Sequence, residues 1–136
     1  MHTRFLRALL VAVVAAAAAS PFLLTATLAA QPLPVRHVVV FKYKPGTSAE
    51  QIKQVTDAFR GLAKKIPGIT AFEDGVNNSP ENKNLGFTHV YQLTFKDVAA
   101  RDAYLPHPDH KKFGELLGKL KVVDDVFVVD YSPATP

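Results

Sequence analysis

Residues 35–43 read Val-Arg-His-Val-Val-Val-Phe-Lys-Tyr, and residues 87–95 read Phe-Thr-His-Val-Tyr-Gln-Leu-Thr-Phe. Both runs are rich in β-branched and aromatic residues, which is typical of strands packed in a core. Because successive side chains of a strand point to opposite faces, His37, Val39 and Phe41 share one face, and Val38 and Val40 share the other. The strands therefore carry apolar side chains on both faces.

The sequence between these two strands predicts a helix followed by a second, weaker strand. Residues 47–50, Thr-Ser-Ala-Glu, have the spacing of a capping box, and Pro67 with Gly68 can stop the helix. The weaker strand covers residues 69–76, and the turn formers of residues 77–84 predict a solvated loop. The apolar stripe of the helix consists of Ile52, Val55, Phe59, Leu62 and Ile66, which recur at steps of three and four.

The C-terminal half repeats this order of elements. Asp97 is expected to cap a short helix, which Pro106 must end, and Pro108 can open the next helical stretch. A last strand runs from about residue 122 to residue 131. The resulting order predicts an α+β fold of the ferredoxin-like βαββαβ type, with a four-stranded antiparallel sheet and the helices on one side. The uncovered apolar face then demands a partner or a ligand.

The N-terminal residues do not resemble domain sequence. Residues 1–30 begin with basic side chains, continue as an uncharged run over residues 8–24, and end in small residues, which is the layout of a secretory signal peptide. We therefore expect export to the periplasm or the medium, with a retained membrane anchor as the alternative. Residues 31–34 form a linker, residues 35–131 form one domain, and residues 132–136 form a disordered tail.

Composition narrows the possible functions. There is no cysteine, so we expect neither disulfides nor a thiol nucleophile. The net charge of +4 falls to +2 without Arg4 and Arg7, because 14 Lys and Arg then face 12 Asp and Glu, and this balance does not indicate nucleic acid binding. No glycine-rich phosphate loop or serine elbow is present, and no cofactor is expected.

Four histidines of the predicted domain are the main candidates for chemistry: His37, His89, His107 and His110. Tyr104 lies in a proline-bounded segment with the last two, which suits general acid–base work, with a histidine taking a proton and a phenol holding an oxyanion.

Each candidate also has a structural interpretation. His107 is expected to be an N-cap-like turn residue, Tyr104 and His110 a hydrogen-bonded pair, and His37 and His89 satisfied core histidines. A zinc site built on His107, Asp109 and His110 has weak support from spacing.

Several motifs together resemble the Dabb family of stress-responsive dimeric α/β barrels. They are residues 37–43, residues 66–68, residues 86–89 and the pattern Tyr104-x-x-His107-Pro108-x-His110-x-x-Phe113. The resemblance spans residues 35–131. It implies a homodimer in which two ferredoxin-like units join through their open sheet faces. The family includes plant stress-responsive proteins and a plant polyketide cyclase.

The resemblance also implies roles for particular residues. His110 would be the general base and Tyr104 the group that polarises a carbonyl, with His37 and His89 in support. Three functions follow as hypotheses: binding of a small organic molecule in an apolar pocket, catalysis as a cofactor-independent cyclase or lyase, and a purely structural dimer. The implied ligand-binding residues are Phe59, Tyr91, His107, Phe113 and Gly114, and a magnesium ion would be held by the backbone carbonyls of Ala63, Ile66 and Ile69.

Overall fold

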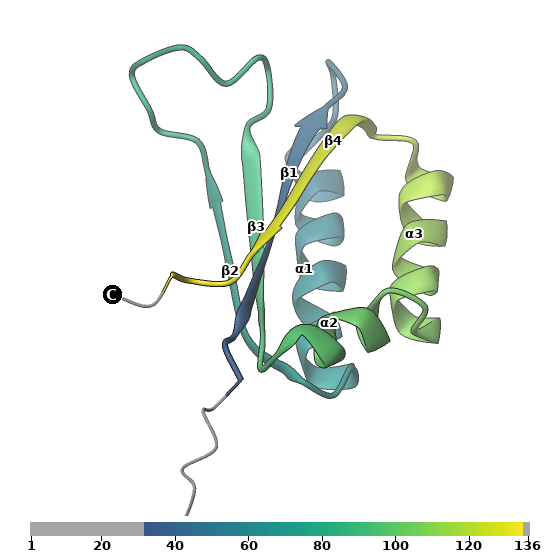
Figure 1. Cartoon of the computed structure of the whole chain (residues 1–136). Coiled ribbons are helices and arrows are strands. Elements are labelled where there is room, and N and C mark those ends of the chain that lie inside the picture. The colour runs from purple at the N-terminus through teal and green to yellow at the C-terminus, as the bar shows by residue number, and fades with distance from the viewer. Residues whose placement is uncertain (1–31, 135–136) are drawn as a thin grey trace, which may run out of the picture.

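The computed structural model describes residues 32–134, and these form one antiparallel sheet with a layer of helices on one side (Figure 1). The strands are β1 (Val35–Tyr43), β2 (Ile69–Val76), β3 (His89–Phe95) and β4 (Val123–Tyr131), in the order β2-β3-β1-β4. The helices are α1 (Ala49–Lys65), α2 (Val98–Tyr104) and α3 (Pro108–Leu120). The predicted ferredoxin-like fold is confirmed.

Three predicted segments lie wholly or partly outside the described residues. They are the signal peptide of residues 1–30, the first residue of the linker of residues 31–34, and the last two residues of the tail of residues 132–136. Within residues 32–134 no helix has the length and apolar character needed to cross a membrane.

The predicted starts of α2 at Asp97 and of α3 at Pro108 are right, and the predicted start of α1 is wrong by one residue. Asp97 caps α2 by accepting from the amide of Ala100 at 2.7 Å. The capping box of α1 was misplaced by one residue: Ser48 is the N-cap, and its partner is Gln51. The hydroxyl of Thr47 instead donates to the carbonyl of Lys44 at 2.8 Å and closes the preceding turn, which leaves the capping role to the next residue.

The core lies between the sheet and the helices, and an aromatic cluster fills its centre. The ring of Phe59 on α1 is 2% exposed. Its centroid lies 4.6 Å from that of Phe113 on α3, 5.2 Å from Tyr91 on β3 and 6.3 Å from Phe41 on β1. One side chain therefore joins the two longest helices to the two central strands.

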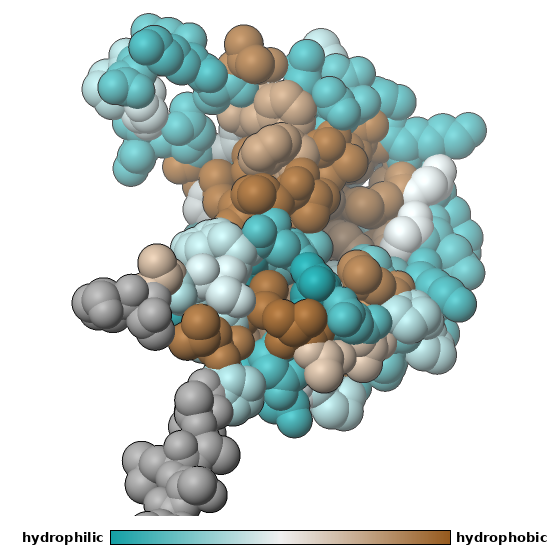
Figure 2. Space-filling model, viewed as in Figure 1, coloured by the Kyte–Doolittle hydropathy of each residue, from teal (hydrophilic) through white to brown (hydrophobic). Residues whose placement is uncertain are grey.

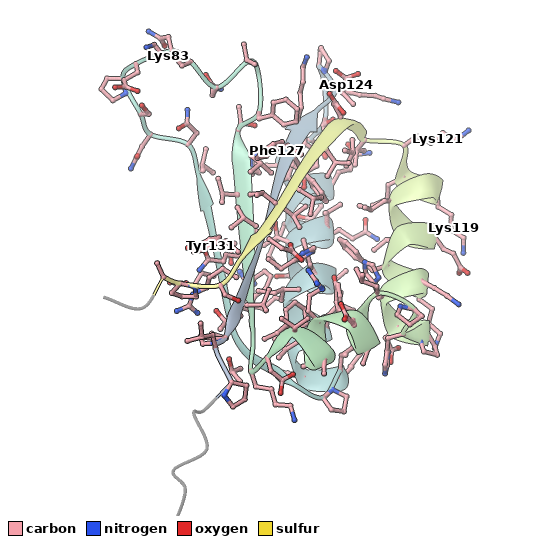
Figure 3. All side chains as sticks on the ribbon, viewed as in Figure 1. Lys83, Lys119, Lys121, Asp124, Phe127 and Tyr131 are labelled. Atoms are coloured by element: carbon pink, nitrogen blue, oxygen red, sulfur yellow. The ribbon has the colours of Figure 1, made fainter. Side chains whose placement is uncertain are left out.

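The opposite face of the sheet is open. Strand register places Val40 between Val90 of β3 and Phe127 of β4, so these three side chains share that face. Phe127 is 52% exposed and Tyr131 is 50% exposed. Both project from β4 (Figure 3), and the brown surface in Figure 2 extends over this strand. The sequence-based prediction of apolar groups on both faces is confirmed.

We expect the substitution Phe59→Ala to lower the free energy of unfolding by about 3–5 kcal/mol, because it removes a buried ring that touches four elements. Leu85→Ala serves as the control, since Leu85 is 82% exposed. Urea unfolding followed by circular dichroism measures both changes. Equal effects of the two substitutions would show that Phe59 is not at the centre of the core.

Candidate functional site

The phenol of Tyr104 is the most unusual polar group in the described residues. Its ring is fully buried at the end of α2, with centroids 5.0 Å from Phe95, 5.6 Å from His37 and 4.2 Å from His110. Its hydroxyl is buried, and within residues 32–134 it has no hydrogen-bond partner. Burial, with a smaller contribution from the Asp130 carboxylate, raises the pKa of Tyr104 well above its usual value. The group is therefore a neutral donor with its proton uncommitted.

His110 lies in the first turn of α3, and its ring packs against that of Tyr104 with the two ring planes tilted by 30°. Its Nδ1 lies 3.0 Å from the carbonyl oxygen of Leu105. Because a carbonyl only accepts, Nδ1 carries the proton and Nε2 is left as the basic nitrogen. The interpretation of Tyr104 and His110 as a hydrogen-bonded pair is wrong, because the Tyr104 hydroxyl has no hydrogen-bond partner within residues 32–134 and the two rings pack against each other instead.

His37 on β1 reaches Tyr104 from the sheet and is held by a carboxylate. Asp130 of β4 is its register partner, and Asp130 Oδ1 lies 2.6 Å from His37 Nδ1. The second oxygen, Oδ2, accepts from Nη1 of Arg101 on α2. Nδ1 of His37 therefore donates, and its Nε2 is again the unprotonated nitrogen when the ring is neutral. His37 is 6% exposed and is, as expected, a core histidine with a partner.

Sequence reasoning missed Asp130 and Arg101. Asp130 interrupts the apolar run of β4, and an acidic residue in such a run is a signal that it has a buried partner. Its partner His37 lies 93 residues earlier in the chain, so only the strand register identifies it.

His107 is the N-cap of α3, as predicted. Its Nδ1 accepts from the amide of Asp109 at 3.2 Å, which leaves this nitrogen unprotonated in the capping state. Nδ1 also lies 3.8 Å from a carboxylate oxygen of Asp109. In the part of the chain that the structure describes, no three side chains of His, Cys, Asp or Glu gather as a metal site.

His89 does not join the other histidines. His37 pairs with Leu93 of β3, and His89 lies four residues before Leu93, or ~13 Å along the strand. Its ring meets that of Tyr43 edge-on at 4.9 Å, and its Nδ1 lies 2.9 Å from the Thr88 hydroxyl. Burial lowers the pKa of His89, so the ring is neutral at pH 7.

The ligand-binding residues suggested by resemblance fall into two groups. Phe59, Tyr91 and Phe113 are buried in the aromatic cluster, whereas His107 is half-buried at the start of α3 and Gly114 is exposed on this helix. Ala63, Ile66 and Ile69, whose carbonyls the resemblance assigns to magnesium, lie in the last turn of α1, at its C-cap and at the start of β2.

A groove lies between β4 and α3 on the helix side of the sheet (Figure 2). Val126 and Val128 lie on the helix side of β4, in the same row as Asp130, yet they are 49% and 50% exposed. The helix α3 packs on α1 through Phe113 and leaves this side of β4 uncovered. Figure 2 shows apolar surface set back between β4 and α3. The groove borders the strand that holds Asp130 and the helix that holds His110.

A sequence model of the stress responsive A/B barrel domain (Dabb) matches residues 35–133. The chain belongs to this family. It is 36% identical over 103 residues to the stress-response A/B barrel domain-containing protein HS1 of Arabidopsis thaliana, covering 75% of this chain and 92% of HS1. It is 27% identical over 99 residues to olivetolic acid cyclase of Cannabis sativa, covering 73% of this chain and 96% of the cyclase.

Solved structures of other proteins agree with the fold. The hydroxynitrile lyase from Passiflora edulis superposes with a TM-score of 0.69 at 27% identity, over 77% of this chain and 97% of the lyase. A dimeric ferredoxin-like protein of unknown function from Jannaschia sp. CCS1 superposes with a TM-score of 0.63 at 30% identity, over 74% of this chain and 99% of that protein.

We expect Tyr104→Phe to leave the free energy of unfolding unchanged or to raise it. The substitution keeps the buried ring and removes a hydroxyl whose desolvation without a partner costs about 1–3 kcal/mol. Thermal unfolding of the two proteins measures the effect. A melting temperature that drops by several degrees would show that the hydroxyl has a structural partner after all.

The lowered pKa of His89 predicts a pH dependence of stability. The unfolded chain binds a proton near pH 6.5, the usual pKa of histidine, and the folded chain binds it only at lower pH. Stability is therefore complete above about pH 6.5 and falls as the solution is acidified through that value. His89→Gln should reduce the difference in melting temperature between pH 7.5 and pH 5.5. An unchanged pH difference in His89→Gln would contradict this assignment.

Proposed function

We propose that this protein is a homodimer that binds a small organic molecule in the groove between β4 and α3, with a carbonyl oxygen of the ligand accepting from Tyr104. The observation that carries the proposal is the buried Tyr104 hydroxyl, which has no partner within residues 32–134. A buried donor without an acceptor is costly, so a folded protein that keeps one has a use for it. The apolar side chains of Val126 and Val128 suit the carbon skeleton of such a ligand.

The open face of the sheet supports the dimer. Phe127, Val129 and Tyr131 are about half exposed on it, and a patch of this kind marks an association surface. Structural neighbours are described as dimeric ferredoxin-like proteins. A second copy that presents the same face would cover both patches at once.

Proton transfer is the second candidate function, and the two histidine tautomers favour it. The Nδ1 atoms of His37 and His110 are both committed to acceptors, so each neutral ring keeps a basic Nε2 next to Tyr104. In such a reaction His110 would take a proton from the carbon next to the ligand carbonyl, and Tyr104 would stabilise the oxyanion that forms. Relatives that include a cyclase and a lyase are consistent with this chemistry.

A purely structural role of the histidines makes a different prediction. If His110 only braces the fold, His110→Ala lowers the melting temperature. If His110 is a base, the same substitution removes turnover and leaves the melting temperature unchanged.

Acetophenone tests binding and proton transfer together, because its carbonyl accepts a hydrogen bond and its methyl protons are acidic. We expect it to bind more tightly than ethylbenzene, which has a similar shape and no acceptor. Tyr104→Phe should remove this preference. In D2O the protein should speed deuterium uptake into the methyl group, and His110→Ala should slow it about 100-fold or more. Calorimetry measures the two affinities. Equal affinity for acetophenone and ethylbenzene would contradict the proposal.

The dimer is tested by two substitutions on one strand. Val129→Lys places a charge on the open face, and we expect it to shift the protein toward monomer in sedimentation experiments. Val126→Lys is a matched control, since Val126 is similarly exposed on the opposite face of β4. It should leave the dimer intact and weaken acetophenone binding. A Val129→Lys protein that sediments like the unmodified one would contradict the proposed interface.

A further inference from the structure

A chain of three hydroxyl groups lies at the end of the sheet away from Tyr104. The hydroxyl of Tyr91 on β3 lies 3.0 Å from that of Tyr43 on β1 and 2.9 Å from that of Thr56 on α1. Three O–H groups bring three protons, and the two hydrogen bonds between them use only two. Whichever direction the chain takes, one proton at one of its ends remains available.

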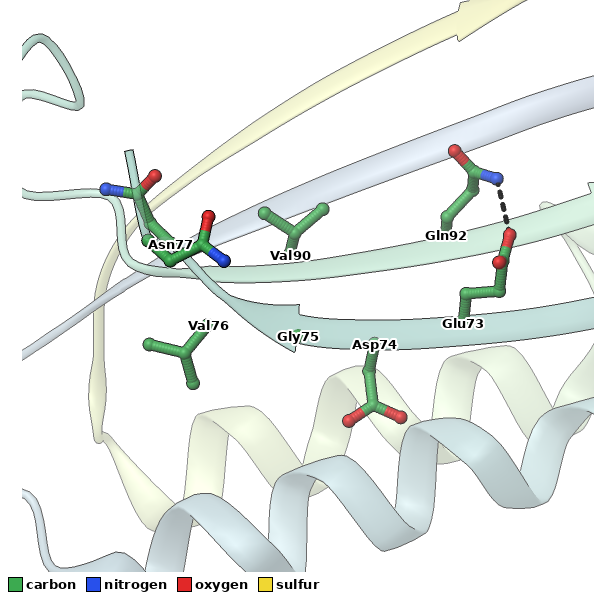
Figure 4. Close-up of a pocket in the computed structure, with 8 residues that line it drawn as sticks. Glu73, Asp74, Gly75, Val76, Asn77, Val90 and Gln92 are labelled. Atoms are coloured by element: carbon green, nitrogen blue, oxygen red, sulfur yellow. Dashed lines mark hydrogen bonds between the residues drawn. The ribbon is translucent and has the colours of Figure 1, made fainter. Parts of the chain in front are cut away.

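This chain adjoins a pocket between α1 and the end of β2. The pocket has a volume of about 360 Å³, and Thr56, Tyr91 and His89 contribute its polar wall. Ile52 and Val76 contribute apolar surface, and Val76 is 63% exposed. Figure 4 shows Asp74 and Val76 pointing from β2 toward the helices, whereas Val90 and Gln92 point to the other face of the sheet. The pocket is at the small end of the range for ligand sites, so it fits a molecule of about one ring.

The charges around the pocket are already paired with one another. Arg60 binds Asp57 at 2.9 Å and Asp74 at 2.7 Å, and Lys53 binds the other oxygen of Asp57. Two cations thus meet two anions, so these four side chains present no unbalanced charge that would attract a charged ligand.

One titratable side chain of the polar wall, His89, and one that lies behind this wall in the hydroxyl chain, Tyr43, are also neutral near pH 7. Burial and the contact with Tyr91 raise the pKa of Tyr43, and burial lowers the pKa of His89. An uncharged ligand therefore suits both the paired charges around the pocket and its neutral polar wall.

We propose that this pocket binds an uncharged small molecule that carries a hydroxyl group, such as a phenol, and that this hydroxyl extends the chain from Thr56. A hydroxyl both donates and accepts, so it fits either direction of the chain. When Tyr43 donates to Tyr91 and Tyr91 to Thr56, Thr56 donates to the ligand; in the reverse direction Thr56 donates to Tyr91 and can accept from the ligand. The site is separate from the groove beside Tyr104 and does not depend on the function proposed for that groove.

Phenol, toluene and benzoate are the probes that test this site by amide chemical shifts. Phenol should shift the amide signals of Thr56, Val76 and His89 in a saturable way. Toluene lacks the hydroxyl and benzoate is charged, so both should bind at least fivefold more weakly. The proposal fails if toluene or benzoate binds as tightly as phenol, or if the phenol shifts cluster around Tyr104 and His110.

Substitutions separate ligand binding from a structural role of the hydroxyl chain. Thr56→Val keeps the shape of the side chain and should weaken phenol binding about 5- to 10-fold. Thr56→Ser should restore the affinity, and Thr70→Val on β2 is the control for loss of a threonine hydroxyl outside the pocket. A Thr56→Val protein with a lower melting temperature and unchanged phenol affinity overturns the proposal. Tyr104→Phe should leave phenol binding unchanged, and loss of binding in this variant would also overturn it.

Discussion

The structure depends on a sheet that is apolar on both faces and covered by helices on only one. The constraint is sharpest in β4, an edge strand in which residues 126–129 read Val-Phe-Val-Val. Alternation sends Phe127 and Val129 to the open face and Val126 and Val128 to the helix side. The helix α3 packs on α1 through the contact between Phe113 and Phe59, and it leaves β4 uncovered. One strand thus carries two separate apolar surfaces, one on each face of the sheet.

The same packing explains why Tyr104 keeps a free proton. Rings of Phe95, His37 and His110 surround the phenol, and none of them offers an acceptor to its hydroxyl. Both histidines have their Nδ1 protons tied elsewhere, one by Asp130 and the other by the Leu105 carbonyl. The packing therefore fixes the tautomers of both neutral histidines and leaves the Tyr104 hydroxyl as an unpaired donor among the described residues.

Periodicity was enough to predict the elements, the faces of the strands and the role of His107, because these depend on residues a few positions apart. The capping box of α1 was misplaced because Thr47 and Ser48 are adjacent and either can cap. The bond between His37 and Asp130 could not be predicted in this way, since it depends on the register of β1 with β4. His89 shares its sheet face with His37, and only the offset along β3 shows that the two are separated.

The two candidate sites are separated in the same way as His37 and His89. The aromatic cluster around Phe59 and Phe41 lies between the Tyr104 region and the hydroxyl chain of Tyr43, Tyr91 and Thr56. Tyr91 belongs both to the aromatic cluster and to the hydroxyl chain, because its ring packs on Phe59 and its hydroxyl is hydrogen-bonded to that of Thr56. Its ring fills the space through which a long ligand would have to pass from one end of the sheet to the other. Dense packing of this kind favours two small ligand sites over one extended tunnel.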